Sequence, residues 1–344
     1  MVLNASQFLR ARCGRALLTL IVLLVPWGGA CGDESGSSFW LPGVYPGFIA
    51  VPPTTGFTMP VTSYYDTGTA GAGQKFQHGI SVNEGLSAQA AVMFFTPTWA
   101  PAGEKWFGGQ PSFSLTFGGG WEKVDASVSL STADNTKTFD RSDTLWGGLD
   151  LFPAAQIAWN NGNNNWMSYI VGDIPTGAYQ ADRLADLGLG HTAVDVGGAY
   201  TYLNLKTGTE ASALLGFTYN GMNTHTYIQS GWDSHLDFNV SQFFNQHINV
   251  GIYGYLYYQL TPDSGAGNLV GAFKSRVAGA GPGVGYMFTV FGQPAYVNLR
   301  GYWEFWAQNR LEGRAAYLSL SIPLYPRSEN TSAAPATPPQ GGHR

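Results

Sequence analysis

The feature that most constrains this chain is an alternation of apolar and polar residues with a period of two, repeated along most of its length. From Ser112, the string SFSLTFG places Phe and Leu on one side and Ser and Thr on the other. The same alternation occurs in HLDFNVS from His235, in YVNLRGYWEF from Tyr296 and in the segment that starts at Tyr317. Successive side chains of a strand point to opposite faces, so each segment predicts a β-strand with one apolar and one polar face.

The number and length of these segments favour a closed barrel. About a dozen of them follow one another, and many are about ten residues long, which is the length that a tilted transmembrane strand needs. Turn-forming clusters separate them, at 160–165 (NNGNNN), 206–208 (KTG) and 262–267 (PDSGAG). Bacterial single-chain barrels have even strand numbers. We therefore join 112–118 and 121–130 across the three glycines between them, which gives about 12 strands.

Composition decides between a soluble β-protein and a membrane barrel. Only 11% of the residues are charged, whereas a soluble protein carries about 25%. A soluble sandwich or propeller also alternates, but its outward face normally carries Lys, Glu and Arg. Here the polar face consists mostly of Ser, Thr, Asn, Gly and Tyr. We therefore predict an all-β fold, a closed antiparallel transmembrane β-barrel over residues 57–326, with its apolar face toward lipid.

Aromatic residues near the segment ends support the membrane interpretation. Trp and Tyr gather at both interfaces of a bilayer, and aromatics make up 14% of this chain. The candidates for such girdles are Tyr64, Tyr65, Trp99, Trp106, Trp166, Trp232 and Trp306. Each of them alone could equally be a core aromatic.

The first thirty residues predict a signal peptide and therefore export. Arg10, Arg12 and Arg15 precede the apolar run 16–27 (ALLTLIVLLVPW), and small residues follow it at 28–30. The run is shorter than the roughly 20 residues that span a bilayer, although a short membrane anchor is the alternative. Cys31 then stands at a position where lipidation is a further alternative. The tail, 327–344, is polar and rich in proline and predicts disorder.

The segment between signal and barrel, 31–56, is expected to form a plug or lid. Its core, 38–53, reads SFWLPGVYPGFIAVPP; it is apolar and is interrupted by prolines, so it cannot be a regular central strand. One hypothesis places it in the barrel mouth or lumen as a plug, and the alternative packs it on a rim as a lid. The residues expected to act there are Phe39, Trp40, Leu41, Pro42, Tyr45 and Phe48.

The polar face of the strands predicts the lining of the lumen. The expected lining residues are Asp195, Asp237, Tyr253, Tyr257, Arg300, Tyr302 and Glu304. Charged side chains inside a small barrel usually pair across the lumen and stiffen it, and contact with a solute is the alternative role. The tyrosines suit an aromatic solute, because each combines a flat apolar ring with a hydroxyl group.

Signals for catalysis, metal binding and nucleic-acid binding are weak. None of the six histidines lies in a motif with a nucleophile. His235 and His247 are expected to begin adjacent strands, which could bring them together at a rim as a poor metal site. The acidic loops around Asp182 and Asp263 lack the spacing of a calcium loop. Without such motifs we expect no enzyme activity and no cofactor. A net charge of −5 without a basic cluster argues against a nucleic-acid partner.

At this point a set of short strings, in order along the chain, becomes informative. They are SFWLPG at 38–43, PTGAY at 175–179, LGLGH at 187–191, YTYLN at 200–204, KTGTE at 206–210, DSGAG at 263–267 and NRLEG at 309–313. With them the chain resembles the outer-membrane family described as "putative MetA-pathway of phenol degradation", from about Ser38 to Tyr325. The resemblance implies an outer-membrane barrel that takes up aromatic or other hydrophobic compounds.

One departure concerns the tail after Tyr325. Barrel proteins usually end on an aromatic residue that the barrel-assembly machinery reads, and here Tyr325 would have to serve from an internal position.

The function expected from the sequence is an outer-membrane channel or transporter for passive uptake of small hydrophobic compounds. Its partners would be outer-membrane lipid, the solute and the barrel-assembly machinery. The alternative is a closed structural barrel whose surface loops bind partners.

Overall fold

The computed structural model describes residues 38–78, 81–132, 135–269, 271–272 and 274–325. The expected signal peptide, Cys31 and the tail 327–344 lie outside these ranges. No helix in the described ranges is long and apolar enough to cross a membrane. The strands are β1 (Gly56–His78), β2 (Ser81–Phe95), β3 (Thr98–Ala100), β4 (Gln110–Thr132), β5 (Asn135–Gly148), β6 (Phe152–Asn161), β7 (Asn164–Gly172), β8 (Ala193–Asn204), β9 (Thr209–Asn220), β10 (Asp233–Phe243), β11 (Ile248–Gln259), β12 (Arg276–Val290), β13 (Gln293–Gln308) and β14 (Glu312–Pro323).

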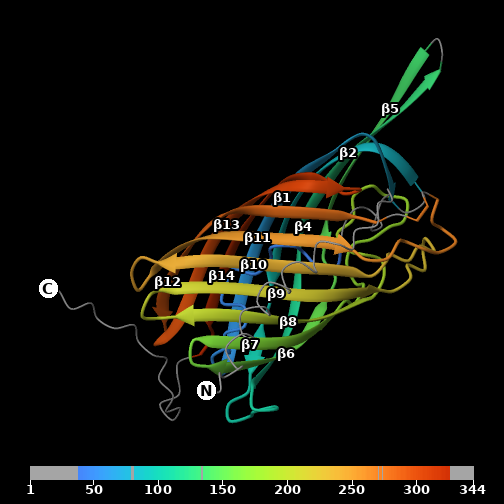
Figure 1. Cartoon of the computed structure of the whole chain (residues 1–344). Helices are drawn as coiled ribbons and strands as arrows, with labels where there is room; N and C mark the ends of the chain where they lie inside the picture. Colours follow the sequence, from blue (N-terminus) through green and yellow to red (C-terminus); the bar gives the residue numbers. More distant parts are fainter. Residues whose placement is uncertain (1–37, 79–80, 133–134, 270, 273, 326–344) are drawn as a thin grey trace, which may run out of the picture.

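These strands form a closed antiparallel barrel of twelve strands, as the alternation predicts (Figure 1). Neighbouring barrel strands follow one another in the chain, and β14 pairs with β1 to close the ring, for example at Tyr64 opposite Tyr317. The ring contains β1, β2, β4 and β6 to β14. The short β3 bridges the starts of β1 and β4, and β5 pairs with the part of β4 beyond β6.

The joining of two alternating segments across three glycines is confirmed by β4. This strand runs without interruption through Gly118, Gly119 and Gly120. A β-carbon on Gly118 or Gly120 would lie within 2.1 Å or 2.0 Å of a carbonyl oxygen of β2. The glycines therefore allow a close backbone approach inside one strand and do not form a turn.

The two faces of the barrel have opposite chemistry. On β8 to β14 the outward residues are apolar and exposed, for example Val196, Phe217, Val240, Ile252 and Leu299. Their inward neighbours are polar and buried, and they include Asp195, Glu210, Thr218, His235, Asp237, Asn239, Arg300 and Ser319. A soluble protein shows the reverse distribution. The apolar outer face that the sequence predicts is therefore the face that this surface presents.

Most of the candidate girdle aromatics lie on the outer surface. Tyr65, Trp99, Trp106, Trp166, Trp232 and Trp306 are each more than 40% exposed. Tyr64 differs, because its ring packs against Tyr317 with centroids 4.7 Å apart on the inner side. Tyr64 and Tyr65 are consecutive in a strand, so only one of the two can face outward.

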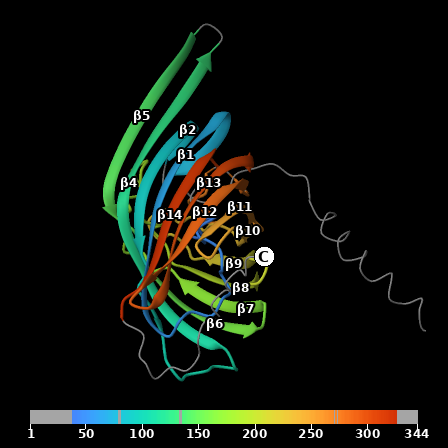
Figure 2. The same ribbon diagram turned by 90° about the vertical axis from the view of Figure 1, so that its left-hand side faces the viewer.

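The two ends of the barrel differ in shape. The chain enters and leaves the barrel at one end, where most turns between strands are short (Figure 1). At the other end the hairpins β1–β2 and β4–β5 extend beyond the ring, and the longer loops after β7, β9 and β11 gather (Figure 2). We call this second end the loop end.

Candidate functional site in the barrel lumen

The N-terminal segment, residues 38–53, runs inside the barrel and not along its rim (Figure 1). It forms no strand, and among the described residues one backbone hydrogen bond lies within it, from Val51 N to Phe48 O at 3.0 Å. Gly43, Gly47 and Phe48 have positive φ angles of 78°, 97° and 55°. A chain with this shape leaves most of its backbone groups without internal partners, so the barrel wall has to supply them.

Arg300 of β13 is the centre of the first set of wall contacts. Its side chain is 1% exposed, and it donates to the carbonyl oxygens of Gly43 (3.0 Å) and Val44. Two further hydrogen bonds, to Asn298 and Ser319, hold the guanidinium against the wall. A planar guanidinium with several fixed donors can bind two carbonyl groups at once, which a lysine could not do with the same geometry.

Side chains on β10, β13 and β14 complete this set around Gly43. Asp237 of β10 accepts a hydrogen bond from Gly43 N at 3.0 Å. Tyr302 of β13 donates to Gly43 O at 3.2 Å, and Tyr317 of β14 donates to Pro42 O at 2.6 Å. A β-carbon at Gly43 would lie 2.9 Å from the rings of Tyr255 and Tyr302, so only glycine fits here.

A second set of contacts fixes the segment further along the chain. Glu210 of β9, which is fully buried, accepts a hydrogen bond from Phe48 N at 3.0 Å. Ser212, Asn239 and Ser241 donate to the same carboxylate and hold it in place. Thr201 of β8 accepts from Ala50 N at 3.1 Å. Because both sets bind backbone groups, the position of the segment depends on the wall more than on the segment's own side chains.

Aromatic rings of the segment pack against rings of the wall. Trp40 stacks on His235 with ring centroids 3.8 Å apart and an interplanar angle of 13°. Phe39 lies 5.8 Å from Phe152, and Phe48 meets Tyr296 edge to face at 5.3 Å. Tyr45 also stacks on Trp40, and burial raises the pKa of its hydroxyl above the ordinary value, so Tyr45 is neutral.

Asp195 and His235 form a buried pair beneath Trp40. The His235 Nε2 and Asp195 Oδ2 atoms are 3.0 Å apart, and both side chains are fully buried. Tyr169 and Thr218 donate to the same carboxylate at 2.7 Å and 2.6 Å. A buried charge costs least when its lone pairs are satisfied, and here both oxygens of Asp195 have partners.

The expectation that His235 and His247 meet at a rim is wrong. His235 lies inside the lumen near the start of β10, whereas His247 lies in the exposed turn before β11 and contacts Met287 O. Adjacent antiparallel strands start at opposite ends of a barrel, so two strand starts cannot be neighbours. Within the described ranges, no three His, Cys, Asp or Glu side chains are grouped for a metal ion.

The remaining predicted lumen residues also lie on the inner side. Tyr253 is 1% exposed, and its hydroxyl is 3.5 Å from Pro46 O. Tyr257 is fully buried, and the guanidinium carbon of Arg310 lies 4.5 Å from the centroid of the Tyr257 ring. Glu304 accepts hydrogen bonds from the Tyr255 hydroxyl (2.7 Å) and from Gly313 N (2.8 Å), so it does not contact the N-terminal segment through these bonds.

The glycine-rich string of β12 makes room for these tyrosines. A β-carbon at Gly279 would lie 2.3 Å from the Tyr255 ring, and one at Gly283 would lie 2.4 Å from the Tyr253 ring. One at Gly285 would lie 2.1 Å from the Tyr296 hydroxyl. The glycines therefore let large rings lie flat on the neighbouring strand, which leaves the centre of the lumen to the N-terminal segment.

Sequence reasoning missed Glu210, Thr201, His235 and Tyr317 as lumen contacts. Glu210 lies in the string KTGTE, which the sequence presents as a turn, although its side chain belongs to the inner face of β9. His235 does lie on the polar side of its alternating segment, in phase with Asp237 and Asn239. The phase of the alternation could therefore have identified His235 and Tyr317, but not which wall residues reach the N-terminal segment.

A small cavity remains beside the first set of contacts. It measures about 10 Å³, which holds one water molecule. Gly43, Tyr45, Asp237, Asn239 and Tyr302 are among its lining residues. Within the part of the chain that the structure describes, the second carboxylate oxygen of Asp237 is buried without a hydrogen bond of good geometry, and a water molecule in this cavity would satisfy it.

A solved outer-membrane channel has a similar barrel fold. A crystallised outer-membrane channel from Pseudomonas putida F1 superposes with a TM-score of 0.58 at 13% identity, over 81% of this chain and 98% of that one. The transport unit of the autotransporter AIDA-I from Escherichia coli gives a TM-score of 0.44 at 12% identity, over 83% and 93%. The translocator domain of the autotransporter NalP from Neisseria meningitidis gives 0.42 at 11% identity, over 79% and 90%.

No curated protein matches the chain in sequence. The family described as "Putative MetA-pathway of phenol degradation" matches residues 66–320. That range covers most of the barrel, from the first strand to the last. The chain therefore belongs to this family, and its fold is that of an outer-membrane channel.

Proposed function

We propose that this protein is an outer-membrane channel for the passive uptake of small hydrophobic compounds, aromatic ones among them. The observation that carries the proposal is an aromatic and apolar N-terminal segment held inside a closed barrel. An open aqueous pore would have a polar, water-filled interior. Here rings of the segment and the wall pack together in the lumen.

Several residues have roles in this proposal. Phe39, Trp40, Leu41, Pro42, Tyr45 and Phe48 belong to the plug that restricts passage of water and ions. Asp237, Arg300, Tyr302 and Tyr253 hold that plug in position, and Asp195 supports it through His235. A hydrophobic solute would move along the aromatic surfaces between plug and wall, where ring stacking replaces water. The mechanism requires no covalent step, cofactor or nucleotide.

Membership of the family supports an aromatic cargo, because the family is described by a pathway of phenol degradation. The apolar outer face of the strands supports a place in a lipid bilayer, and the fold supports the outer membrane. A second candidate is a closed structural barrel with partner-binding loops. The hydrogen bonds between plug and wall support this second candidate, because they hold the plug in place and would keep the lumen closed.

Uptake of N-phenylnaphthylamine by cells with an intact lipopolysaccharide leaflet tests this function. The dye is apolar, is slowed by lipopolysaccharide and fluoresces when it reaches an apolar environment. Cells that express the protein should take up the dye faster than cells with an empty vector. Proteoliposomes with the refolded protein should swell slowly in small sugars. Dye uptake at the control rate would contradict the channel and favour the closed barrel, and rapid sugar swelling would indicate an ordinary porin.

A further inference from the structure

The loop between β7 and β8 is folded into the mouth of the barrel at the loop end. We call residues 173–192 the mouth loop. A loop of this length without secondary structure is uncommon in a compact fold and usually has a function. Two of its residues, Leu184 and Ala185, are 2% and 0% exposed. They belong to an apolar cluster that, among the described residues, includes none from the N-terminal segment.

The base of the mouth loop is fixed by backbone bonds to one carboxylate. Asp150, between β5 and β6, accepts hydrogen bonds from Gly177 N at 2.6 Å and from Leu189 N at 2.7 Å. Gly177 and Leu189, which lie on either side of the tip in the sequence, are thereby held by the same carboxylate. The tip, from Gln180 to Asp186, lies between these two bonds.

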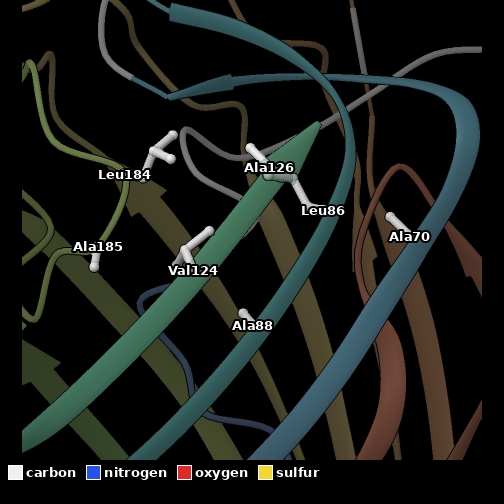
Figure 3. Packing of buried hydrophobic residues seen from close by; sticks show 7 residues of the cluster. All are labelled: Ala70, Leu86, Ala88, Val124, Ala126, Leu184 and Ala185. Atoms are coloured by element: carbon white, nitrogen blue, oxygen red, sulfur yellow. The ribbon is translucent and has the colours of Figure 1, made fainter. Parts of the chain in front are cut away.

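The tip is held by an apolar contact, by one ion pair and by hydrogen bonds, among them those that Asp143 and Glu122 accept from its backbone and one from Arg141 to Asp182 O. Arg183 donates two hydrogen bonds to Asp143 of β5, at 3.0 Å and 2.7 Å, and both side chains are partly exposed. Leu184 and Ala185 lie against the inner surface of three strands (Figure 3). We call this surface the apolar wall; it consists of Ala70 of β1, Leu86 and Ala88 of β2, and Val124 and Ala126 of β4.

The apolar wall lies beyond the lipid-facing band of the barrel. Lys123 and Asp125 alternate with Val124 and Ala126, so they point outward, and they form an exposed ion pair at 2.9 Å. Outward charges place this part of β4 in water and not in hydrocarbon. An inward surface at that height would normally be polar, but here small apolar side chains line it, and Leu184 fills the space that they leave.

We propose that the apolar wall is the first binding site for an uncharged, apolar solute, and that Leu184 occupies this site until a solute displaces it. The inference rests on the proposed function, for which it supplies the point of uptake. Leu184 of the mouth loop occupies the place of the solute. Its packing shows that an apolar group of the size of an isobutyl group fits against the wall. A solute that binds here would need to displace one leucine, to break one partly exposed ion pair and to release the backbone hydrogen bonds that Asp143 and Glu122 accept, while the base at Asp150 stays fixed.

The charges around the wall define the class of solute. Glu122 of β4 lies two residues before Val124 and therefore on the same face, and its carboxylate accepts a hydrogen bond from Asp186 N at 2.9 Å. Asp143 accepts backbone hydrogen bonds from Leu184 and Ala185. Burial raises the pKa of Glu122 to about 8, so the negative charge beside the wall is that of Asp143, which loses Arg183 and the two backbone donors when the tip moves away. An anionic solute would be repelled by Asp143, so neutral arenes and similar compounds fit better than fatty acids or benzoates.

Photolabelling of the refolded full-length protein tests this site. The probes are benzophenone, which is neutral, and 4-benzoylbenzoate, which carries the same photoreactive group and a negative charge. Benzophenone should label the wall peptides that contain Leu86 and Val124, as read by mass spectrometry, and 4-benzoylbenzoate should label them weakly. The variant Leu184→Ser should increase benzophenone labelling at these peptides, because the apolar occupant is gone. Leu187→Ser, on the same loop but outside the cluster, should label like the parent protein.

A disulfide that locks the tip gives the opposite change. In a background with Cys13→Ser and Cys31→Ser, the pair Val124→Cys and Leu184→Cys should form a disulfide, after which labelling of the wall is lost and reducing agent restores it. Heat-modified gel mobility reports whether each variant is folded. Labelling that Leu184→Ser leaves unchanged, or that maps to other peptides, would overturn the proposal. This outcome does not depend on whether the locked protein folds.

Dye uptake separates this proposal from the proposed function. If N-phenylnaphthylamine enters cells at the control rate while the photolabelling pattern holds, the binding site stands and the channel function fails. If the dye enters through the parent protein and equally fast through the locked variant, the channel stands and the wall is not the site of uptake, which overturns the inference.

Discussion

The N-terminal segment and the mouth loop both enter the barrel, but the wall holds them in different ways. The N-terminal segment is bound through its backbone by buried side chains such as Arg300, Asp237 and Glu210. The tip of the mouth loop is held by an apolar contact at Leu184, by a partly exposed ion pair and by three backbone hydrogen bonds to Asp143 and Glu122. Backbone bonds to buried charges are costly to break because they leave unpaired groups behind. Apolar contacts can instead be exchanged for another apolar partner, and hydrogen bonds to the partly exposed Asp143 can be exchanged for water. We therefore expect the first element to stay and the second to move.

Replacement of Arg300 should produce the largest effect. Arg300→Met leaves the carbonyl groups of Gly43 and Val44 without their donor and Asp237 without a nearby positive charge. Breaking a buried charged network of this kind costs about 3–5 kcal/mol. Urea unfolding of the refolded barrel, followed by gel mobility, measures the loss. Arg314→Met, at an exposed position on β14, is the matched control and should unfold like the parent; equal midpoints for the two variants would show that the N-terminal segment is not anchored at Arg300.

A smaller, pH-dependent effect is expected at the base of the mouth loop. Asp173 is 4% exposed, neither of its carboxylate oxygens has a hydrogen-bond partner among the described residues, and burial raises its pKa to about 8. A carboxyl whose pKa is raised on folding contributes most below its unfolded pKa near 4, and this contribution is lost as the pH rises through 8. Stability should therefore fall by about 1–3 kcal/mol over that window, the usual cost of burying an unpaired polar group.

Asp173→Asn should remove this pH dependence, because the amide does not ionise. Urea midpoints at pH 5 and pH 9 measure the effect in the parent and the variant. Asp182→Asn, at an exposed carboxylate of the same loop, should keep the dependence of the parent. A slope that persists in Asp173→Asn would assign the titration to another group.

The alternating pattern predicts the barrel because each strand repeats the same local rule. It gives the phase of the side chains, so Asp195, Asp237, Arg300 and Tyr302 are expected inside, and the structure places them on the inner side of the wall. Partners across the lumen depend on register and strand direction, which the local pattern does not contain. For this reason the neighbours of Glu210 could not be read from the sequence, whereas the separation of His235 from His247 follows from the opposite directions of adjacent antiparallel strands. Leu184 and Ala185 lie in an irregular loop, where no period reveals that they are buried.

The central claim is that residues 38–53 plug the lumen against water and ions. The most direct test is single-channel conductance of the refolded protein in a planar bilayer, with and without these residues. We expect small, rare steps from the parent protein and large, long-lived steps after the deletion, because the wall contacts would then face an open lumen. Heat-modified gel mobility confirms that the shortened protein is a folded barrel. A folded deletion variant with the conductance of the parent would contradict the account.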